Sequence, residues 1–375
     1  MKRKILNFLL VLTGFCVLYV IISYRIDKTN VYPVRRMTHS TTIAYNVDLE
    51  NITRKDLVDK LPLQKRTPVI LFYNRPDWIS FDNVANLDAC PYKCDFTDDK
   101  NKLDDSEAVF FVSSEHPRVP KQGKKKEQIW IFFNLESPIT YPNGFKQWEN
   151  LINWTMTYRL DSDIWTSDHE IVLNENSGYN PNNKSKPVSW LVSHCNVQSR
   201  RDEFTKILKK HIKVDNFGNC GTMKVNCKGY ANNDCWRGFL KRYFFYLSLE
   251  NSFCRDYITE KAFNPLNNSI VPVVRGGAFY NKYLPLQSYI NTANFETIKS
   301  LSDYLTNLIE NEALFRNYFT WRKHYNAILY SRIARSFCEL CRRLHFKDKY
   351  KRYYESLYDW WVTGAHCNNT IEDLH

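Results

Sequence analysis

The 375-residue sequence lacks the short motifs that mark several large enzyme classes. It contains no GxGxxG and no P-loop, which excludes the common phosphate-binding turns of dinucleotide-binding and P-loop proteins. GxSxG and HExxH are also absent, so the sequence indicates neither a typical serine hydrolase nor a typical zinc protease. Asp161-Ser-Asp163 has a metal-binding spacing, but no clean apolar strand precedes it, and we predict no metal site.

The composition excludes a disordered chain. Hydrophobic residues make up 43% of the sequence and aromatic residues 15%, which is enough to build sizeable cores. At 375 residues, the chain is long enough for two domains. Lys and Arg outnumber Asp and Glu by 52 to 40, which gives a net charge of +12, and we expect most of these charges on solvated surface.

Long apolar runs are absent except for one at the N-terminus. Basic residues 2–4 precede an almost uninterrupted apolar run over residues 5–22, which as a helix nearly covers the hydrocarbon core of a bilayer. A cleaved signal peptide is the alternative, but Ser23-Tyr24-Arg25 offers no small-residue cleavage site. The sequence therefore predicts a cytosolic tail at 1–4, a signal-anchor transmembrane helix at 5–22 and a single-pass type II protein whose bulk is luminal.

Cysteine usage agrees with a luminal location. Cys16 lies in the predicted span, and ten cysteines follow it: Cys90, Cys94, Cys195, Cys220, Cys227, Cys235, Cys254, Cys338, Cys341 and Cys367. An even set fits five disulfides in an oxidising compartment, with the pairing left open. The spacings Cys90-x3-Cys94 and Cys338-x2-Cys341 could instead bind zinc, although such sites usually have His or Cys partners in one compact module.

Sequons also point to the secretory pathway. Candidate N-glycosylation sites begin at Asn51, Asn153, Asn183, Asn267 and Asn368. For a luminal protein, the positive net charge fits a phosphorylated donor or an acidic surface better than a nucleic acid.

Short apolar runs indicate two α/β units after a polar stem at residues 23–66. The first series is 69–73, 108–112 and 129–133, and the second is 188–193, 212–214, 244–249 and 270–274. Such runs, separated by helix-like stretches, are typical of buried parallel strands. We predict domains at 67–180 and 181–345, separated within the Asn-, Pro-, Ser- and Gly-rich stretch 174–186, and a C-terminal segment at 346–375.

Glu136 lies directly after the predicted strand 129–133, in the stretch Asn134-Leu-Glu-Ser-Pro138. Open parallel sheets bind ligands beyond the carboxyl ends of their strands, so this carboxylate is placed where a general base would serve. A carboxylate that caps the following turn is the alternative interpretation.

A second candidate is the stretch ENSFCRDYITEK at residues 250–261, which follows a strand of the second series. Its end looks like the start of a helix, whose free N–H groups and positive dipole end attract phosphate. We expect Lys261 to add a charge for a diphosphate, Tyr257 a ring face or hydroxyl, and Glu260 an acceptor for ribose hydroxyls. An ordinary charged helix start is the alternative, and Glu250 is assigned only a structural role.

Arg200 and Arg201 are a third candidate, at the front of the predicted helix 201–210. An arginine at this place can bind phosphate through two parallel hydrogen bonds, although paired arginines are also common on helix surfaces. A further helix is predicted after Ser300-Leu-Ser-Asp303, which resembles a capping box.

Together, these blocks resemble the α1,3-fucosyltransferases, glycosyltransferase family 10. The match covers about residues 67–347 and rests on Asn134-Leu-Glu-Ser-Pro138, on residues 153–163 (NWTMTYRLDSD), and on residues 243–276 with ENSFCRDYITEK and VPVVRG. The resemblance implies an α/β GT-B fold, with one Rossmann-like domain for the acceptor facing another for GDP-β-L-fucose. It also implies a Golgi enzyme that transfers L-fucose, with inversion, to a GlcNAc hydroxyl of a glycoprotein or glycolipid glycan in α1,3 linkage.

The family's residue roles carry over by matching position. Glu136 stands where the general base stands, and the donor-binding block is matched by Asn251, Tyr257, Glu260 and Lys261. Arg201 matches a phosphate-binding arginine, with Arg200 as the alternative one residue away. Transfer in this family requires no bound metal, although a divalent cation such as Mn²⁺ can raise activity. The resemblance further implies disulfides that tie the C-terminal segment, through Cys338 and Cys341, to Cys90 and Cys94.

The sequence departs from the family at Pro265, which stands inside the helix expected after Lys261 and should end or kink it early. Arg275 adds a charge where relatives often carry an apolar residue, so it should reach either the donor or solvent. The alternative function is a catalytically inactive luminal glycan-binding protein on the same fold, which would be expected to have lost Glu136 or the Glu260-Lys261 pair. Core and Lewis-type acceptors both fit the sequence.

Overall fold

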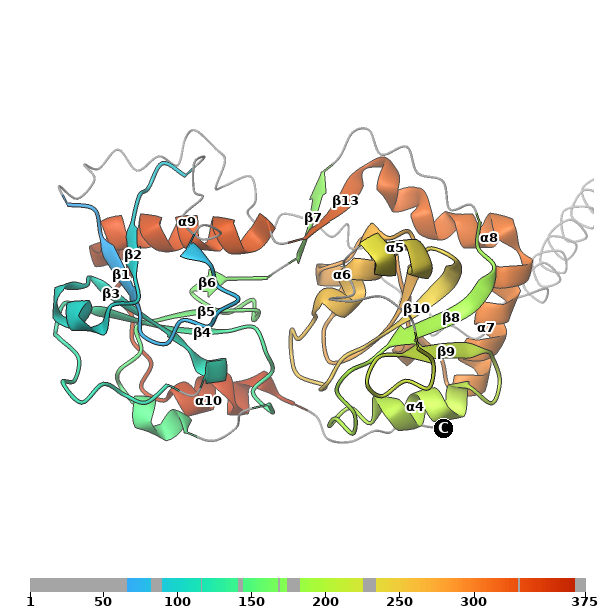
Figure 1. Ribbon diagram of the computed structural model, residues 1–375, viewed down its shortest axis with the longest axis horizontal. Coiled ribbons are helices and arrows are strands. Elements are labelled where there is room, and N and C mark those ends of the chain that lie inside the picture. The colour runs from blue at the N-terminus through green and yellow to red at the C-terminus, as the bar shows by residue number, and fades with distance from the viewer. Residues whose placement is uncertain are drawn as a thin grey trace, which may run out of the picture.

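The computed structural model describes residues 66–81, 90–115, 117–140, 144–167, 169–173, 183–224, 234–329 and 331–367. They form two lobes, each built on a parallel sheet (Figure 1). The predicted signal anchor at 5–22 and almost all of the stem lie outside the described residues. Within the described part of the chain, no helix is both long enough and apolar enough to cross a membrane.

The N-terminal lobe contains a six-stranded sheet in the order β2-β1-β3-β4-β5-β6. All its strand pairs are parallel. Its strands are β1 (Val69–Phe72), β2 (Asp95–Thr97), β3 (Ala108–Val112), β4 (Ile129–Asn134), β5 (Trp154–Thr157) and β6 (Ile164–Trp165). Every residue of β3 is buried, as expected of a parallel strand covered on both faces.

Helices from the far C-terminal part of the chain cover both faces of this sheet. Alternate residues of β4 point to opposite faces, so Phe133 joins the core under α9 (Ser331–His345), while Phe132 packs against Trp361 of α10 (Leu357–Trp361). The two helices lie on opposite sides of the sheet in Figure 1. The sequence-predicted second domain, 181–345, thus ends in a helix that packs on the N-terminal sheet.

The C-terminal lobe contains a five-stranded parallel sheet in the order β12-β11-β10-β8-β9. Its strands are β8 (Lys186–Leu191), β9 (Val214–Phe217), β10 (Tyr243–Leu249), β11 (Val271–Arg275) and β12 (Ile290–Asn291), and its helices are α4 (Arg201–Leu208), α5 (Asp234–Leu240), α6 (Glu260–Asn267), α7 (Ile298–Glu310) and α8 (Glu312–Arg316). The strand order reverses between β8 and β10, and such a switch point is where open α/β sheets bind ligands.

The chain crosses between the lobes through a two-stranded antiparallel ribbon of β7 (His169–Leu173) and β13 (Tyr325–Leu329). This ribbon lies between the two sheets in Figure 1. The crossing through β13 brings the chain back to the N-terminal lobe, where α9 and α10 complete the core.

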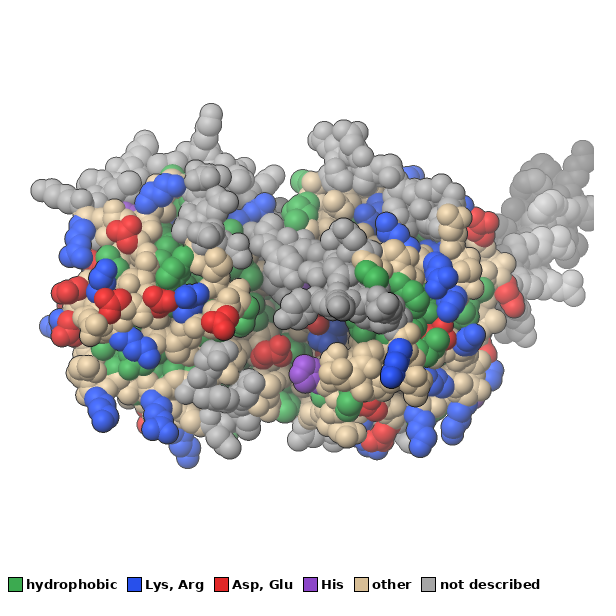
Figure 2. Space-filling view, in the orientation of Figure 1, with side chains coloured by type: hydrophobic (Ala, Val, Ile, Leu, Met, Phe, Trp, Pro, Cys, Tyr) green, Lys and Arg blue, Asp and Glu red, His purple; other side chains and the backbone are tan. Residues whose placement is uncertain are grey.

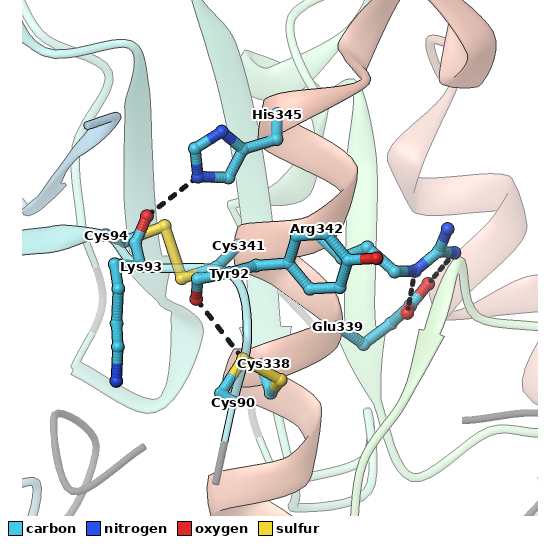
Figure 3. Close-up of a disulfide and its surroundings, with 9 residues drawn as sticks. All are labelled: Cys90, Tyr92, Lys93, Cys94, Cys338, Glu339, Cys341, Arg342 and His345. Carbon is cyan, nitrogen blue, oxygen red and sulfur yellow. Dashed lines mark hydrogen bonds and ion pairs between the residues drawn. A yellow bond between two sulfur atoms is a disulfide. The ribbon is translucent and has the colours of Figure 1, made fainter. Parts of the chain in front are cut away.

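Two disulfides fasten α9 to the segment before β2 (Figure 3). Cys90 is bonded to Cys338 and Cys94 to Cys341, which confirms the link implied by the family resemblance and leaves these thiols paired rather than free to bind zinc. A ring nitrogen of His345 lies 2.9 Å from the carbonyl oxygen of Lys93 and adds a hydrogen bond to the same junction.

The other described cysteines are also oxidised. Cys195 pairs with Cys220 inside the C-terminal lobe, whereas Cys254 pairs with Cys367 and joins that lobe to the end of the chain. Cys235 is disulfide-bonded as well, and Cys227 lies outside the described residues.

Candidate active site

Glu136 lies in the turn after β4 with its side chain exposed. The turn is closed by Asn134, whose Oδ1 accepts a hydrogen bond of 2.7 Å from the Glu136 backbone N–H and whose amide donates to Ser113 Oγ. The carboxylate of Glu136 therefore does not cap this turn. Instead, its Oε2 accepts a hydrogen bond of 2.8 Å from the hydroxyl of Tyr257 in the other lobe.

The stretch between β10 and α6 is organised around Glu250, which is 1% exposed. Glu250 Oε1 accepts a 2.8 Å hydrogen bond from the backbone N–H of Thr259, and Thr259 Oγ1 lies 2.9 Å from Glu250 Oε2. Thr259 is in turn the N-cap of α6, since its side chain accepts from the Lys261 N–H. Glu250 thus fixes the start of the helix, and it also contacts Lys261, a role that the sequence did not predict.

Lys261 presents its ammonium group among oxygen atoms at the start of α6. Nζ lies 2.8 Å from Thr259 Oγ1, 3.3 Å from Glu250 Oε2 and 3.1 Å from Glu260 Oε1. Burial alone would lower the pKa of Lys261, but the charges of Glu250, Glu260 and Glu136 together raise it above its ordinary value. Burial raises the pKa of Glu250, which Lys261 opposes. These carboxylates therefore favour the charged form of Lys261 at the start of α6.

Pro265 lies inside α6, and the helix ends two residues later at Asn267. Because proline has no N–H, the carbonyl of Lys261 lacks its usual helical donor. Ser248 Oγ on β10 supplies it, with a hydrogen bond of 2.6 Å to the Lys261 carbonyl oxygen. The predicted early end of the helix is confirmed, and the strand next to it compensates for the missing bond.

Arg201 is buried where β8 and β10 end. Its guanidinium donates to the carbonyl oxygens of Leu249 (2.9 Å) and His194 (2.8 Å), while its Nε has no partner among the described residues. Burial lowers the pKa of Arg201, and Glu250 opposes the shift. Arg200, by contrast, is an exposed residue paired with Glu203 on the same helix.

Asn251 lies two residues after the end of β10 and carries a buried Oδ1 with no hydrogen-bond partner in the described part of the chain. Its backbone carbonyl accepts a 3.0 Å hydrogen bond from Ser199. This places Asn251, Arg201 and Lys261 together beyond the carboxyl ends of the strands at the switch point.

Arg275 reaches neither solvent nor an open site, contrary to both alternatives drawn from the sequence. The side chain is 1% exposed and donates a 2.7 Å hydrogen bond to the Ser199 carbonyl. Its guanidinium lies 5.0 Å from the ring centre of Phe204 and 4.6 Å from that of Phe253. Arg275 therefore joins the segment before α4 to the stretch after β10.

A cavity of about 180 Å³ lies at the carboxyl ends of β3 and β4, close to the turn that carries Glu136. Its lining is mostly aromatic with a few polar groups: Phe111, Ser113, Pro117, Arg118, Phe132, Gly144, Phe145, Gln147, Trp148 and Ile152. Ser113 links it to the turn, because its Oγ accepts from the same Asn134 that holds Glu136. No group of His, Cys, Asp and Glu able to hold a metal occurs among the described residues.

The candidate glycosylation sites differ in accessibility. Asn183 is exposed and Asn267 is half-buried at the end of α6, while Asn51 and Asn368 lie outside the described residues. The amide of Asn153 is engaged: Oδ1 accepts from the Trp130 N–H (2.9 Å), and Nδ2 donates to the Arg352 carbonyl (3.1 Å).

The net positive charge does not gather in one patch on the face drawn in Figure 2. Lys and Arg side chains are spread over both lobes, with Asp and Glu side chains among them. This distribution agrees with the expectation that most charged side chains lie on the solvated surface. The few charged residues inside the site therefore say more about function than the net charge does.

Comparison with known proteins gives two family matches. The family model "Glycosyltransferase family 10 (fucosyltransferase) C-term" matches residues 181–360, and "Fucosyltransferase, N-terminal" matches residues 65–168. The chain is 32% identical to alpha-(1,3)-fucosyltransferase fut-6 of Caenorhabditis elegans, over 90% of this chain and 89% of the relative. It is 31% identical to alpha-(1,3)-fucosyltransferase C of Drosophila melanogaster, over 75% of this chain and 72% of the relative.

Solved structures agree in fold. A crystal structure of an alpha1,3-fucosyltransferase with GDP-fucose superposes with a TM-score of 0.52 at 15% identity, covering 76% of this chain and 93% of that protein. A second, with GDP, gives a TM-score of 0.53 and covers 80% and 96%. At this identity the likeness concerns the α/β fold with parallel sheets.

Proposed function

Because the chain belongs to the family 10 fucosyltransferases, we propose that it transfers L-fucose from GDP-β-L-fucose to a GlcNAc hydroxyl of a glycan, in α1,3 linkage and with inversion. The observation that carries this proposal is the meeting of the Glu136 carboxylate of the N-terminal lobe with Tyr257 and the nearby cation Lys261 of the C-terminal lobe. The inactive glycan-binding alternative is disfavoured, since this chain retains Glu136, Glu260 and Lys261.

In the proposed reaction, the oxygen of the acceptor hydroxyl bonds to C1 of fucose, and Glu136 accepts the proton that this hydroxyl loses. The bond between C1 and the β-phosphate oxygen breaks, and its electron pair leaves with GDP. Positive charge near that phosphate stabilises the leaving group, and Lys261 is placed to supply it at the start of α6. Attack from the face opposite the leaving group inverts the configuration at C1.

We assign the donor to the C-terminal lobe. Lys261 and Arg201 would contact the diphosphate, Arg201 with donors not spent on the Leu249 and His194 carbonyls. Glu260, which is 46% exposed, would accept from the ribose hydroxyls, and Asn251 would use its unpartnered amide oxygen. These assignments follow the family positions and are supported by the location of all four residues after β8 and β10.

We assign the acceptor to the N-terminal lobe, where the aromatic cavity adjoins the Glu136 turn. Aromatic faces pack well against the apolar faces of sugar rings, while Arg118 and Gln147 at the rim offer hydrogen bonds. The two lobes would then be the two facing Rossmann-like domains of a GT-B fold, with domains at 67–180 and 181–345. Of the C-terminal segment 346–375, the described residues 346–367 return to the first domain.

We further propose a Golgi protein held in the membrane by residues 5–22, with its catalytic part in the lumen. The disulfides of the described chain support an oxidising compartment. No metal is required for transfer in this proposal, because Lys261 and Arg201 carry the charge near the phosphates, and a divalent cation such as Mn²⁺ acts only as a stimulant.

The decisive experiment incubates the purified luminal chain with GDP-fucose and a panel of acceptors, with mass spectrometry of the products. The panel includes the innermost GlcNAc of an N-glycan core and an antennal GlcNAc, because both acceptor types fit the sequence. We expect one fucose to be added in α1,3 linkage. Thermal stabilisation by GDP-fucose without transfer to any acceptor would instead favour the inactive glycan-binding protein.

A further inference from the structure

Tyr257 joins the two lobes at the proposed base. Its hydroxyl donates a hydrogen bond of 2.8 Å to Glu136 Oε2, while the ring is fully buried. The sequence placed Tyr257 with the nucleotide, as a stacking face or a hydroxyl. In the structure, the ring packs edge-on against Tyr158 with 5.2 Å between ring centres, and its hydroxyl is directed at the carboxylate.

The hydroxyl is held in place by the surrounding segment. Five residues earlier, Ser252 Oγ donates a 2.7 Å hydrogen bond to Ser137 Oγ, next to Glu136. Cys254 is tied to Cys367, and the Arg255 N–H donates 2.8 Å to the Ala365 carbonyl. The segment 252–257 is thus fastened to the Glu136 turn and to the end of the chain, so Tyr257 approaches Glu136 with little freedom.

The surroundings make Tyr257 a lasting hydrogen-bond donor. Burial, together with the nearby charge of Glu136, raises the pKa of Tyr257 well above its ordinary value, so the phenol keeps its proton. The other charged or titratable groups at this corner are Tyr158, after β5, and Arg201, Glu250, Glu260 and Lys261 of the C-terminal lobe. Tyr158 and Lys261 interact electrostatically with Glu136, whereas Arg201, Glu250 and Glu260 interact with Tyr257. Among these groups, Tyr257 makes the hydrogen bond to the carboxylate.

We propose that Tyr257 is a positioning residue for the general base: its hydroxyl holds Glu136 Oε2 and leaves Oε1 to take the proton of the acceptor hydroxyl. This inference rests on the proposed function. The base belongs to the lobe assigned to the acceptor, whereas the group that orients it belongs to the lobe assigned to the donor. The carboxylate is therefore correctly oriented only when the segment 252–257 lies against the Glu136 turn.

The test compares Tyr257→Phe with Ser252→Ala in the full luminal chain. Tyr257→Phe keeps the buried ring and removes only the hydroxyl, so we expect kcat to fall about tenfold or more. The acidic limb of the kcat–pH profile should move to higher pH, because the carboxylate loses a hydrogen bond to its charged form. GDP affinity, measured by calorimetry, should stay within about twofold.

Ser252→Ala is the matched control, since it removes the neighbouring bond between the lobes without touching the Glu136 carboxylate. We expect its acidic limb to stay in place. If Tyr257→Phe weakens GDP binding and leaves the pH profile unmoved, Tyr257 belongs to the donor site and the inference is wrong. The inference is also wrong if the two variants behave alike.

A double-mutant cycle gives a second readout. In Glu136→Asp, the shorter carboxylate cannot reach both Tyr257 and the acceptor, so adding Tyr257→Phe should cost little more. Additive losses would overturn the inference. The experiments distinguish failure of this inference from failure of the proposed function. If the wild type is active and Tyr257→Phe has no effect, only the positioning role is rejected. If the wild type is inactive on every acceptor, both are rejected.

Discussion

Oε2 of the buried Glu250 lies 3.3 Å from Nζ of Lys261, so the cation assigned to the donor site is held by a carboxylate that solvent barely reaches. This pairing gives Lys261→Ala two separable effects. Loss of the cation should raise the KM for GDP-fucose and lower kcat. It should also leave the Glu250 charge buried and unpaired, which costs about 3–5 kcal/mol of stability.

The double variant Lys261→Ala/Glu250→Gln separates these effects, because it removes the unpaired charge without restoring the cation. We expect thermal and chemical denaturation to show most of the stability regained, with donor kinetics still impaired. Unchanged donor kinetics in the single variant would remove Lys261 from the phosphate site.

Glu136→Gln should fold, bind GDP and lose transfer. The amide keeps the size of the carboxylate, and its oxygen can still accept from Tyr257, but it cannot take the acceptor proton. General bases typically contribute about 10²- to 10⁴-fold to the rate, and we expect a loss of kcat in that range. Calorimetric GDP binding serves as the control for folding, and wild-type turnover in the purified variant would contradict the assignment.

Ser248→Ala should lower the free energy of unfolding, because Pro265 has no N–H to donate to the Lys261 carbonyl. The Ser248 hydroxyl is the donor to this carbonyl, and leaving the carbonyl unpaired costs about 1–3 kcal/mol. In Ser248→Ala/Pro265→Ala, the new backbone N–H at position 265 can donate to that carbonyl. Urea denaturation should therefore show the double variant to be more stable than Ser248→Ala alone, and an equal or lower stability would count against this account.

The two disulfides that hold α9 should be redundant with each other. They close nearly identical loops, with sequence separations of 248 and 247, so either alone removes most of the loop entropy of the unfolded chain. We expect Cys338→Ser or Cys341→Ser to lower the melting temperature slightly. Loss of all four cysteines should cost roughly 2–5 kcal/mol. Calorimetry that found additive losses would show that the disulfides act by local packing instead.

Lys184 makes stability depend on pH. Its Nζ donates to the carbonyls of Lys241 and Ser269, and burial, aided by the charge of Lys241, lowers its pKa to about 7. Between about pH 7 and pH 10 the unfolded chain then binds more protons at this residue than the folded one, so stability rises with pH. Denaturation at about pH 7 and pH 9 should show that the free energy of unfolding rises more between these two pH values for the wild type than for Lys184→Gln.

The positions of the buried strands could be predicted from the sequence because the residues of these strands are apolar on both faces of the sheet. The run 108–112 coincides with β3, and 129–133 and 244–249 each differ from a strand by one residue. Strands with polar residues, such as β5 and β7, gave no such signal. The start of α7 was misplaced, because the capping box pairs Thr297 with Ser300 rather than beginning at Ser300.

The site could be outlined from the sequence because parallel strands bring their carboxyl ends to one edge. That rule placed Glu136 and Lys261, but it says nothing of side-chain direction. Arg275 was therefore expected at the donor or in solvent and is buried. The structural role expected of Glu250 is confirmed at the start of α6, whereas its contact with Lys261 was not predicted. The bond between Tyr257 and Glu136 depends on how two lobes meet, which no local pattern encodes.

The return of α9 and α10 to the N-terminal sheet constrains how the protein can be made. While the ribosome is still synthesising the second half, the strands β1 to β6 lack the helices that cover both faces, and Cys90 and Cys94 await partners not yet translated. The sheet of the first half thus stays uncovered on both faces until these helices are made. We infer that truncation before residue 331 leaves the N-terminal lobe unable to mature, and that the folding of this lobe is completed from the C-terminal part of the chain.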